Sequence, residues 1–286
     1  MDAMIKAIRQ AMGLSQQEFA DLLGSSFTSV NRWENGRANP GRMAQKRLYE
    51  LCTKRKIAVR ELIVQKIQTV VDGLTVEPDR VILYHGSKSG INGKIAPISR
   101  DKCDFGRGFY MGTDPEQPLT LISDFEDSKF YIVSIDPGQL KTVNICPDLE
   151  WAMLVAYHRG KMERIKGTKL YKTYAQIAQG ADVIIGSIAN DRMFYVLDNF
   201  FLGAITDKAL VMSLSALQLG QQYAAVTQKG CDAVRIEAEI PLSYLERQCM
   251  KDISEENRVK GINLANDICK NYRREGMFFD ELLDQA

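Results

Sequence analysis

The first residues of the chain carry apolar positions at helical spacing. Ile8 follows Met4 by four residues and Ile5 by three, as on one face of a helix, and Gly13 follows the last turn. Ser15 and the glutamate three residues later form an S-x-x-E capping box, which marks the start of a second helix. The pattern therefore predicts two short helices joined by a tight turn.

Further along the chain the pattern mixes helices with strands. Ser26 is suited to cap a third helix that ends before an Asn-Gly pair, and residues 42–73 favour one more helix and a connecting helix. Residues 81–87 and 234–240 alternate or run apolar as strands do, and residues 254–274 carry an imperfect amphipathic stripe. The predicted fold class is α+β, with an all-α head followed by a body of strands and flanking helices.

The segment LSQQEFADLLGSSFTSVNRWENGRANP resembles the Cro/phage-repressor helix-turn-helix family. The resemblance implies that the second helix of the motif enters the major groove of operator DNA and that the preceding helix is held at the phosphates. It assigns DNA contacts to Gln16, Gln17, Ser26, Phe27, Thr28, Ser29, Asn31 and Arg32. Heads of this kind commonly act as dimers on two-fold sites, so a homodimer is expected.

One residue of the head departs from the family pattern. Phe27 stands where a polar residue is common, so either it contacts a thymine methyl group or base specificity is reduced. In an alternative interpretation Asn31 and Arg32 are only a solvated helix face in a module that dimerises. The positions of these polar residues favour the DNA-binding interpretation.

The distribution of charge agrees with a division of the chain into a head and a body. Residues 1–60 carry a net charge of +6 and the rest carries −5, which fits a nucleic-acid-binding module joined to a body that does not bind nucleic acid through bulk charge. The six cysteines form no C-x-x-C pair and only two histidines are present, so we expect reduced, mostly buried thiols and no metal site. The start of the chain lacks a secretory signal and no apolar run is long enough to span a membrane, so a soluble, cytoplasmic protein is expected.

Two glycine-containing motifs follow the first predicted strands. One is L-Y-H-G-S, which includes His85, and the other is D-F-G-R-G-F-Y, which ends at Tyr110. Glycines allow the backbone to approach a flat or phosphorylated ligand, and neighbouring aromatic rings offer faces for stacking. Taken singly, however, each histidine or tyrosine is more often a packing residue than a site residue.

Together these motifs resemble an uncharacterised bacterial domain family of the ADP-ribosyltransferase superfamily. The resemblance continues in G-A-D-V-I-I-G-S-I-A-N-D at residues 180–191 and in Gln222-Tyr223, followed by Thr227 and Lys229, so that it covers about residues 80–235. It implies a split β-sheet body with flanking helices, no metal, and NAD as substrate.

The resemblance also implies a role for each matched residue. His85 would hydrogen-bond a ribose hydroxyl of NAD, the Gly86 backbone would meet the nicotinamide amide, Tyr110 would stack on the nicotinamide ring, and Gln222 would take the third catalytic position. Residues expected to line the NAD site are His85, Gly86, Ser87, Arg107, Gly108, Phe109, Tyr110, Asn190 and Asp191. Two alternatives stay open, since Arg107 either faces the pyrophosphate or is a solvated loop residue, and Asn190 with Asp191 either lines the cleft or caps a turn.

Gln222 departs from the H-Y-E pattern of the superfamily. An amide can hydrogen-bond a 2′-hydroxyl but cannot place a full negative charge beside a developing cation. Glu237-Ala238-Glu239 mimics the E-x-E of arginine-modifying relatives, although the alternation around it favours an ordinary strand with one polar face.

The predicted organisation has three parts. Residues 1–65 form the helix-turn-helix domain, residues 75–240 the NAD-binding domain, and residues 241–286 a C-terminal helical extension. The leading hypothesis is an enzyme that transfers ADP-ribose to a macromolecule and autoregulates its transcription, as in toxin-antitoxin or phage-defence systems with an antitoxin or regulatory protein as partner. The alternatives are a sensor of NAD or another nucleotide without catalysis, and a partner-binding body with a decayed cleft.

Overall fold

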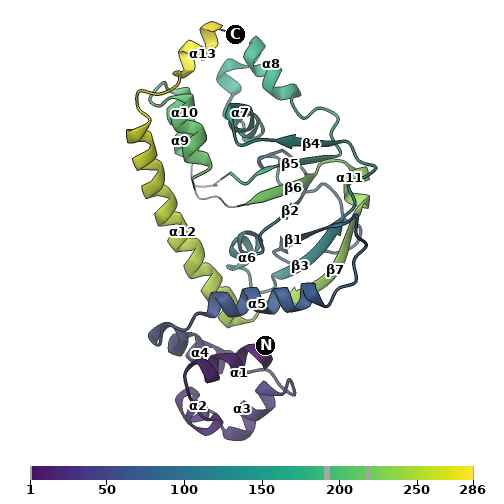
Figure 1. Cartoon of the computed structure of the whole chain (residues 1–286), viewed down its shortest axis with the longest axis vertical. Helices are drawn as coiled ribbons and strands as arrows, with labels where there is room; N and C mark the ends of the chain where they lie inside the picture. Colours follow the sequence, from purple (N-terminus) through teal and green to yellow (C-terminus); the bar gives the residue numbers. More distant parts are fainter. Residues whose placement is uncertain (1, 190–193, 217–219, 286) are drawn as a thin grey trace.

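The computed structural model describes residues 2–189, 194–216 and 220–285. The molecule is elongated, with a small helical head at one end and a larger body built around one sheet (Figure 1). A long helix runs along one side of the body from the head towards the opposite end (Figure 1). The architecture is mixed α+β, as the sequence predicts.

The head follows the predicted order of helices. Its elements are α1 (Asp2–Ala11), α2 (Gln16–Leu23), α3 (Phe27–Glu34), α4 (Arg42–Lys54) and α5 (Val59–Asp72). The capping box predicted at the start of α2 is present, because Ser15 accepts from the backbone of Glu18 and the Glu18 side chain accepts from the backbone of Ser15. Ser26 caps α3 in the same way, accepting from Ser29 N at 3.1 Å.

The body is built on a seven-stranded sheet. Its strands are β1 (Val81–Ser87), β2 (Phe109–Gly112), β3 (Lys129–Ile135), β4 (Thr142–Ile145), β5 (Val183–Ser187), β6 (Gln221–Ala225) and β7 (Val234–Pro241). The strand order is β4-β5-β6-β2-β1-β3-β7, and β4 and β5 are parallel while the other neighbours are antiparallel.

Neighbouring strands in the middle of the sheet diverge. Strands β1 and β3 pair over seven positions, whereas β1 and β2 pair only at Tyr84 and Gly112. The sheet therefore consists of two halves, β4-β5-β6-β2 and β1-β3-β7, which meet at one residue pair. The motifs L-Y-H-G-S and D-F-G-R-G-F-Y lie on both sides of this divergence.

Helices cover the sheet, and the buried side chains of the body form separate hydrophobic cores. The body helices are α6 (Glu116–Ile122), α7 (Leu149–His158), a 3₁₀ turn (Glu163–Ile165), α8 (Lys169–Gln176), α9 (Phe194–Phe201), α10 (Asp207–Leu214), α11 (Gln228–Asp232), α12 (Tyr244–Asn271) and α13 (Phe279–Gln285). One core joins α7, α9, α10 and α13 to strands β5 and β6, and Phe279 is its last large side chain. Another lies on the opposite face of the sheet around Leu83, Phe109 and Tyr131.

The C-terminal helix is longer than the sequence pattern indicates. The amphipathic stripe predicts a start near Ser254, but α12 begins ten residues earlier at Tyr244. A second capping box, formed by Ser243 and Glu246, starts the helix there. The Glu246 carboxylate is buried and also accepts from Lys66 Nζ of α5 at 2.7 Å. The early turns are missed because their buried face contacts the head and body on different sides, which weakens the periodic signal.

Head and body share one continuous hydrophobic core. The cluster that contains Ile8 and Phe19 of the head also contains Phe130 of β3 and Leu245 of α12, with α5 between them. Polar contacts add to this junction, since Tyr49 of α4 donates to Asp252 of α12 at 2.7 Å. The predicted head boundary at residue 65 therefore falls within a helix that packs on both parts.

Two further expectations concern the burial of the cysteines and the presence of a membrane-spanning helix. All six cysteines are free, but only Cys52 and Cys231 are buried and Cys146 is exposed, so the expectation of mostly buried thiols is wrong. No helix among residues 2–189, 194–216 and 220–285 is long and apolar enough to cross a membrane.

Candidate functional site

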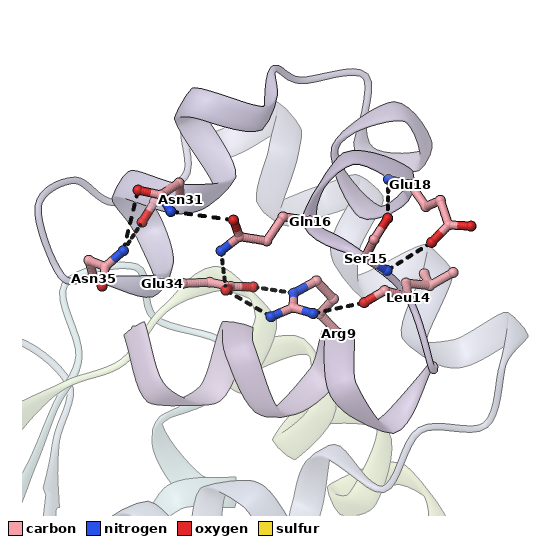
Figure 2. A network of polar contacts seen from close by, with 8 residues as sticks. All are labelled: Arg9, Leu14, Ser15, Gln16, Glu18, Asn31, Glu34 and Asn35. Atoms are coloured by element: carbon pink, nitrogen blue, oxygen red, sulfur yellow. Dashed lines mark hydrogen bonds and ion pairs between the residues drawn. The ribbon is translucent and has the colours of Figure 1, made fainter.

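A partly buried ion pair fixes the geometry of the helix-turn-helix motif. Arg9 of α1 contacts Glu34 of α3 through two bonds of 2.6 and 3.0 Å, and it also donates to the carbonyl of Leu14 at 2.7 Å (Figure 2). Burial alone would raise the pKa of Glu34, but hydrogen bonds from Arg9 and Gln16 lower it. Glu34 is thus held ionised where all the helices of the motif meet.

Gln16 belongs to this network rather than to a free surface. Its amide nitrogen donates to Glu34 at 2.7 Å and its amide oxygen accepts from Asn31 at 3.3 Å (Figure 2). The side chain therefore ties the start of α2 to α3. It thereby fixes the orientation of α3, the reading helix that the family resemblance places in the major groove. Gln17 is exposed and donates to Asp21 at 2.8 Å, so it stays at the surface where a phosphate contact is expected.

The reading helix α3 turns its polar residues outwards. Phe27, Thr28 and Arg32 are exposed, whereas Ser29 and Asn31 are half-buried. Phe27 is 47% exposed although it is a large apolar side chain. An aromatic ring left in water at this position fits a contact with DNA, because it has no role in the core of the head.

His85 lies at the divergence of the two half-sheets. Its Nδ1 is 2.7 Å from the backbone oxygen of Tyr110, and its ring stacks on Phe109 with 4.1 Å between centroids. Burial lowers the pKa of His85, against a smaller opposing effect of the Tyr110 carbonyl. Nε2 has no hydrogen-bond partner within the described ranges of the chain.

Tyr110 uses its hydroxyl to hold the D-F-G loop. The hydroxyl accepts from Phe105 N at 2.9 Å and donates to Gly106 O at 2.8 Å. The ring packs against the core under α7 and α9. Burial raises the pKa of Tyr110, and the nearby Asp104 carboxylate raises it further. The side chain is thus a neutral clamp on its own loop.

Gln222 belongs to a buried polar cluster that the sequence does not reveal. Its amide nitrogen donates to Asp104 Oδ2 at 2.7 Å and to Ser187 O at 3.3 Å. Asp104 Oδ1 accepts from Arg159 Nε at 2.9 Å, and Oδ2 also accepts from Ala189 N at 3.1 Å. Asp104, Arg159 and Gln222 are all less than 8% exposed.

The register shows which predicted residues share a face of the sheet. Tyr110 lies opposite Ala224, and Gly112 lies opposite both Gln222 and Tyr84, so Tyr110 and Gln222 share one face. His85 follows Tyr84 and points to the other face, where it meets Phe109. Tyr110 and Gln222 therefore meet the same Asp104 loop, and the His85 side chain does not join them.

The glycines of the two motifs have packing reasons. A Cβ on Gly86 would come within 2.6 Å of Pro118 O, so helix α6 can approach β1 only at a glycine. Gly106 has φ +78°, and a Cβ there would lie 2.8 Å from His158 Nδ1. At both glycines the backbone thus lies close against other groups of the protein.

The remaining predicted residues lie around these groups. Ser87 pairs with Lys129 at the end of β1, and Gly108 N donates to Ser99 Oγ at 3.0 Å. Arg107 is exposed and forms an ion pair with Asp101, which agrees with the interpretation as a solvated loop residue. Asn190 and Asp191 lie outside the described residues.

Glu237 and Glu239 behave as residues of a polar strand face. Ser134 of the neighbouring strand donates to Glu237, and Glu239 forms an ion pair with Lys129 at 2.7 Å. The alternation of residues 234–240 therefore predicted this strand correctly.

Sequence reasoning missed Asp104, Arg159 and His158. Asp104 was visible as the first residue of the D-F-G-R-G-F-Y motif, and a carboxylate that precedes a buried phenylalanine could have been recognised as a partner for a cation. Arg159 and His158 lie at the end of α7, which is apolar or aromatic between Glu150 and His158, and no local pattern distinguishes them there.

Comparison with known families covers both parts of the chain. Residues 5–42 match the helix-turn-helix family, which supports the prediction of a DNA-binding head. No curated protein and no solved structure matches the chain. Residues 81–236, more than half of the chain, match the family described as protein of unknown function (DUF3990), and the chain therefore belongs to that family.

Proposed function

We propose that this protein is a transcriptional regulator whose head binds operator DNA and whose body responds to NAD. The observation that carries the proposal is the continuous core between the head and the body. A head that shares buried side chains with its neighbour cannot be reoriented independently of it. A change in the body is therefore transmitted to the reading helix.

The head has the properties that operator binding requires. Its net charge of +6 attracts the phosphate backbone, and α3 exposes Thr28 and Arg32 beside the apolar ring of Phe27. The Arg9–Glu34–Gln16 network holds this helix at a fixed angle to α2. Two heads related by a two-fold axis would read two half-sites, so we propose a homodimer on DNA.

The residues matched with the ADP-ribosyltransferase superfamily fit NAD only in part. NAD would supply a labile bond between its ribose and its nicotinamide. His85 fits the role of holding a ribose hydroxyl, because Nδ1 is fixed by Tyr110 O while Nε2 has no partner among the described residues. Tyr110 and Gln222 do not fit a joint clamp with His85, since both side chains are bonded to the Asp104–Gly106 loop on the other face.

A second candidate is that the body also transfers ADP-ribose to a macromolecule, as a component of a toxin-antitoxin or phage-defence system with an antitoxin as partner. One observation favours it. The three positions matched with the triad lie on the consecutive strands β6, β2 and β1 at the centre of the sheet. The bonds of Tyr110 and Gln222 to the loop favour the sensor instead.

The deciding experiment measures two quantities on the full chain. One is the release of free nicotinamide from NAD in the presence of cell lysate, and the other is the affinity for DNA taken from upstream of the coding sequence, with and without NAD. A sensor changes its DNA affinity with NAD and releases no nicotinamide, whereas a transferase releases nicotinamide and labels a macromolecule.

Two variants make the experiment specific to the proposed site. His85→Ala should abolish either response, and Cys146→Ser, which changes an exposed residue away from the strand divergence, should leave both unchanged. The proposal is wrong if NAD neither alters DNA affinity nor releases nicotinamide. It is equally wrong if His85→Ala behaves as the native protein does.

A further inference from the structure

A cavity of about 390 Å³ lies apart from the His85 site. It opens between the D-F-G loop, helices α7 and α8, and strand β5, with Ile184 on the sheet side. The side chains of His85, Tyr110 and Gln222 do not line it. Its volume is within the range of sites that take small organic ligands.

The lining of the cavity combines aromatic, aliphatic and polar side chains. Tyr157 and His158 supply half-buried rings and Val226 a half-buried aliphatic side chain, and the buried Phe105, Leu154 and Ile184 also line it. The rings of Tyr157 and His158 meet edge to face, with 5.0 Å between centroids. Surfaces of this kind favour a planar aromatic ligand over a sugar or a flexible chain.

The loop that forms one wall is already rigid. Tyr110 bonds the backbone of both Phe105 and Gly106, and Arg159 holds Asp104 beside them. His158 lies directly against the Gly106 backbone, where any Cβ would be too close to the ring. A ligand would thus enter a preformed wall and would not have to order it.

Three polar side chains at the cavity are available to a ligand. Among the described residues, the side chains of Tyr157, His158 and Gln179 form no hydrogen bond. Burial lowers the pKa of His158 to about 4, so its imidazole is neutral and offers one donor and one acceptor. The edge of a nitrogen heterocycle presents the same combination of donor and acceptor.

We propose that this cavity binds the planar base of a nucleobase-bearing ligand, with the Tyr157 ring and Val226 against its face and His158 and Gln179 at its edge. Arg107 lies at the rim in an exposed ion pair with Asp101. Exposed pairs contribute little stability, so Arg107 is available to exchange its partner for a phosphate of the ligand. The base can come from a free nucleoside, a nucleotide or NAD.

Calorimetric titration of the full chain tests the proposal with adenosine, guanosine, cytidine, uridine, AMP and NAD. At least one of these probes should bind. His158→Leu should weaken binding about tenfold, which corresponds to the loss of one good hydrogen bond. Ala175→Leu, which fills the cavity from α8, should weaken it by at least as much. Ala178→Leu replaces Ala175→Leu if circular dichroism shows that the latter does not fold.

A control and a comparison of probes complete the design. Lys172→Ala changes an exposed residue of the same helix that does not line the cavity, and binding should stay as in the native protein. Stronger binding of AMP than of adenosine, lost in Arg107→Met, would identify a nucleotide as the ligand. Equal binding of the two would identify a nucleoside.

The proposal is overturned if none of the probes binds, or if binding survives both His158→Leu and the cavity-filling variant. Its failure is distinguishable from failure of the proposed NAD response, because that response is measured by nicotinamide release or DNA affinity and depends on His85.

Discussion

The head and the body use the polar residues of their motifs in opposite ways. In the head, the polar network of Arg9, Gln16 and Glu34 lies beneath the surface and leaves Thr28 and Arg32 exposed on α3. In the body, Gln222 and the Tyr110 hydroxyl turn inwards and bond to the loop at Asp104–Gly106. The polar residues of the head motif thus keep a surface exposed, whereas Tyr110 and Gln222 of the body motif hold a buried loop in place.

The largest expected effect concerns the buried ion pair of the body. Arg159→Met leaves Asp104 as a buried carboxylate without its cation, so the free energy of unfolding should fall by about 3 to 5 kcal/mol. Arg107→Met removes an Arg–Asp pair of the same chemistry from an exposed loop, and it should change the free energy by less than about 0.5 kcal/mol. Urea denaturation followed by circular dichroism measures both. If both variants lost the same free energy of unfolding, the distinction between the buried and the exposed ion pair would be contradicted.

A second test changes the residue that departs from the superfamily pattern. Gln222→Glu replaces the amide donor with a carboxylate that faces Asp104 and the carbonyl of Ser187, so both contacts become repulsive. We expect a loss of about 3 kcal/mol in stability and no gain in nicotinamide release. Gln221→Glu, at the exposed neighbouring position, is the matched control. A stable and more active Gln222→Glu variant would show that position 222 is catalytic.

A third test uses acid. The pKa of His158 is about 4 in the folded chain, below its ordinary value of 6.5, because burial disfavours the charged ring. Its contribution to stability is therefore complete above pH 6.5 and is lost as the pH falls towards 4. Between pH 6.5 and about pH 5 the loss should be about 2 kcal/mol. Thermal unfolding across this interval should show a steeper decline for the native protein than for His158→Leu, and identical slopes would refute the assignment.

The smallest effect is expected at the surface of the head. Arg32→Ala should weaken operator binding about tenfold and leave the thermal stability unchanged, because the side chain is exposed on α3. Arg55→Ala removes the same charge from the turn between α4 and α5 and serves as the control. Gel-shift titrations at several salt concentrations measure both variants. If the two weaken binding alike, Arg32 acts only through bulk charge.

Local sequence signals predicted the elements better than they predicted the site. Ser15 with Glu18 and Ser26 marked the helices of the head correctly, since each cap depends on residues three positions apart. The same rule could have placed the start of α12, because Ser243 and Glu246 form an identical box. The apolar stripe was given more weight there, and the start was predicted ten residues late.

The arrangement of the site depends on contacts that no local pattern contains. Asp104 and Gln222 are 118 positions apart and Asp104 and Arg159 are 55 apart. Which face His85 occupies follows from the single pairing of Tyr84 with Gly112, which fixes the alternation on both strands. The sequence singled out His85, Tyr110 and Gln222 as candidates, but the partners of these side chains could be identified only from the fold.

Helix α12 connects the far end of the body to the head without interruption. With 28 residues it is about 42 Å long, so a tilt of about 5° at its body end displaces the head end by about 4 Å. This distance exceeds the axial rise of about 3.4 Å between base pairs. A small angular change in the packing of α12 on α10 would therefore displace the junction with the head by a distance comparable to one base-pair step, because the length of α12 amplifies the tilt.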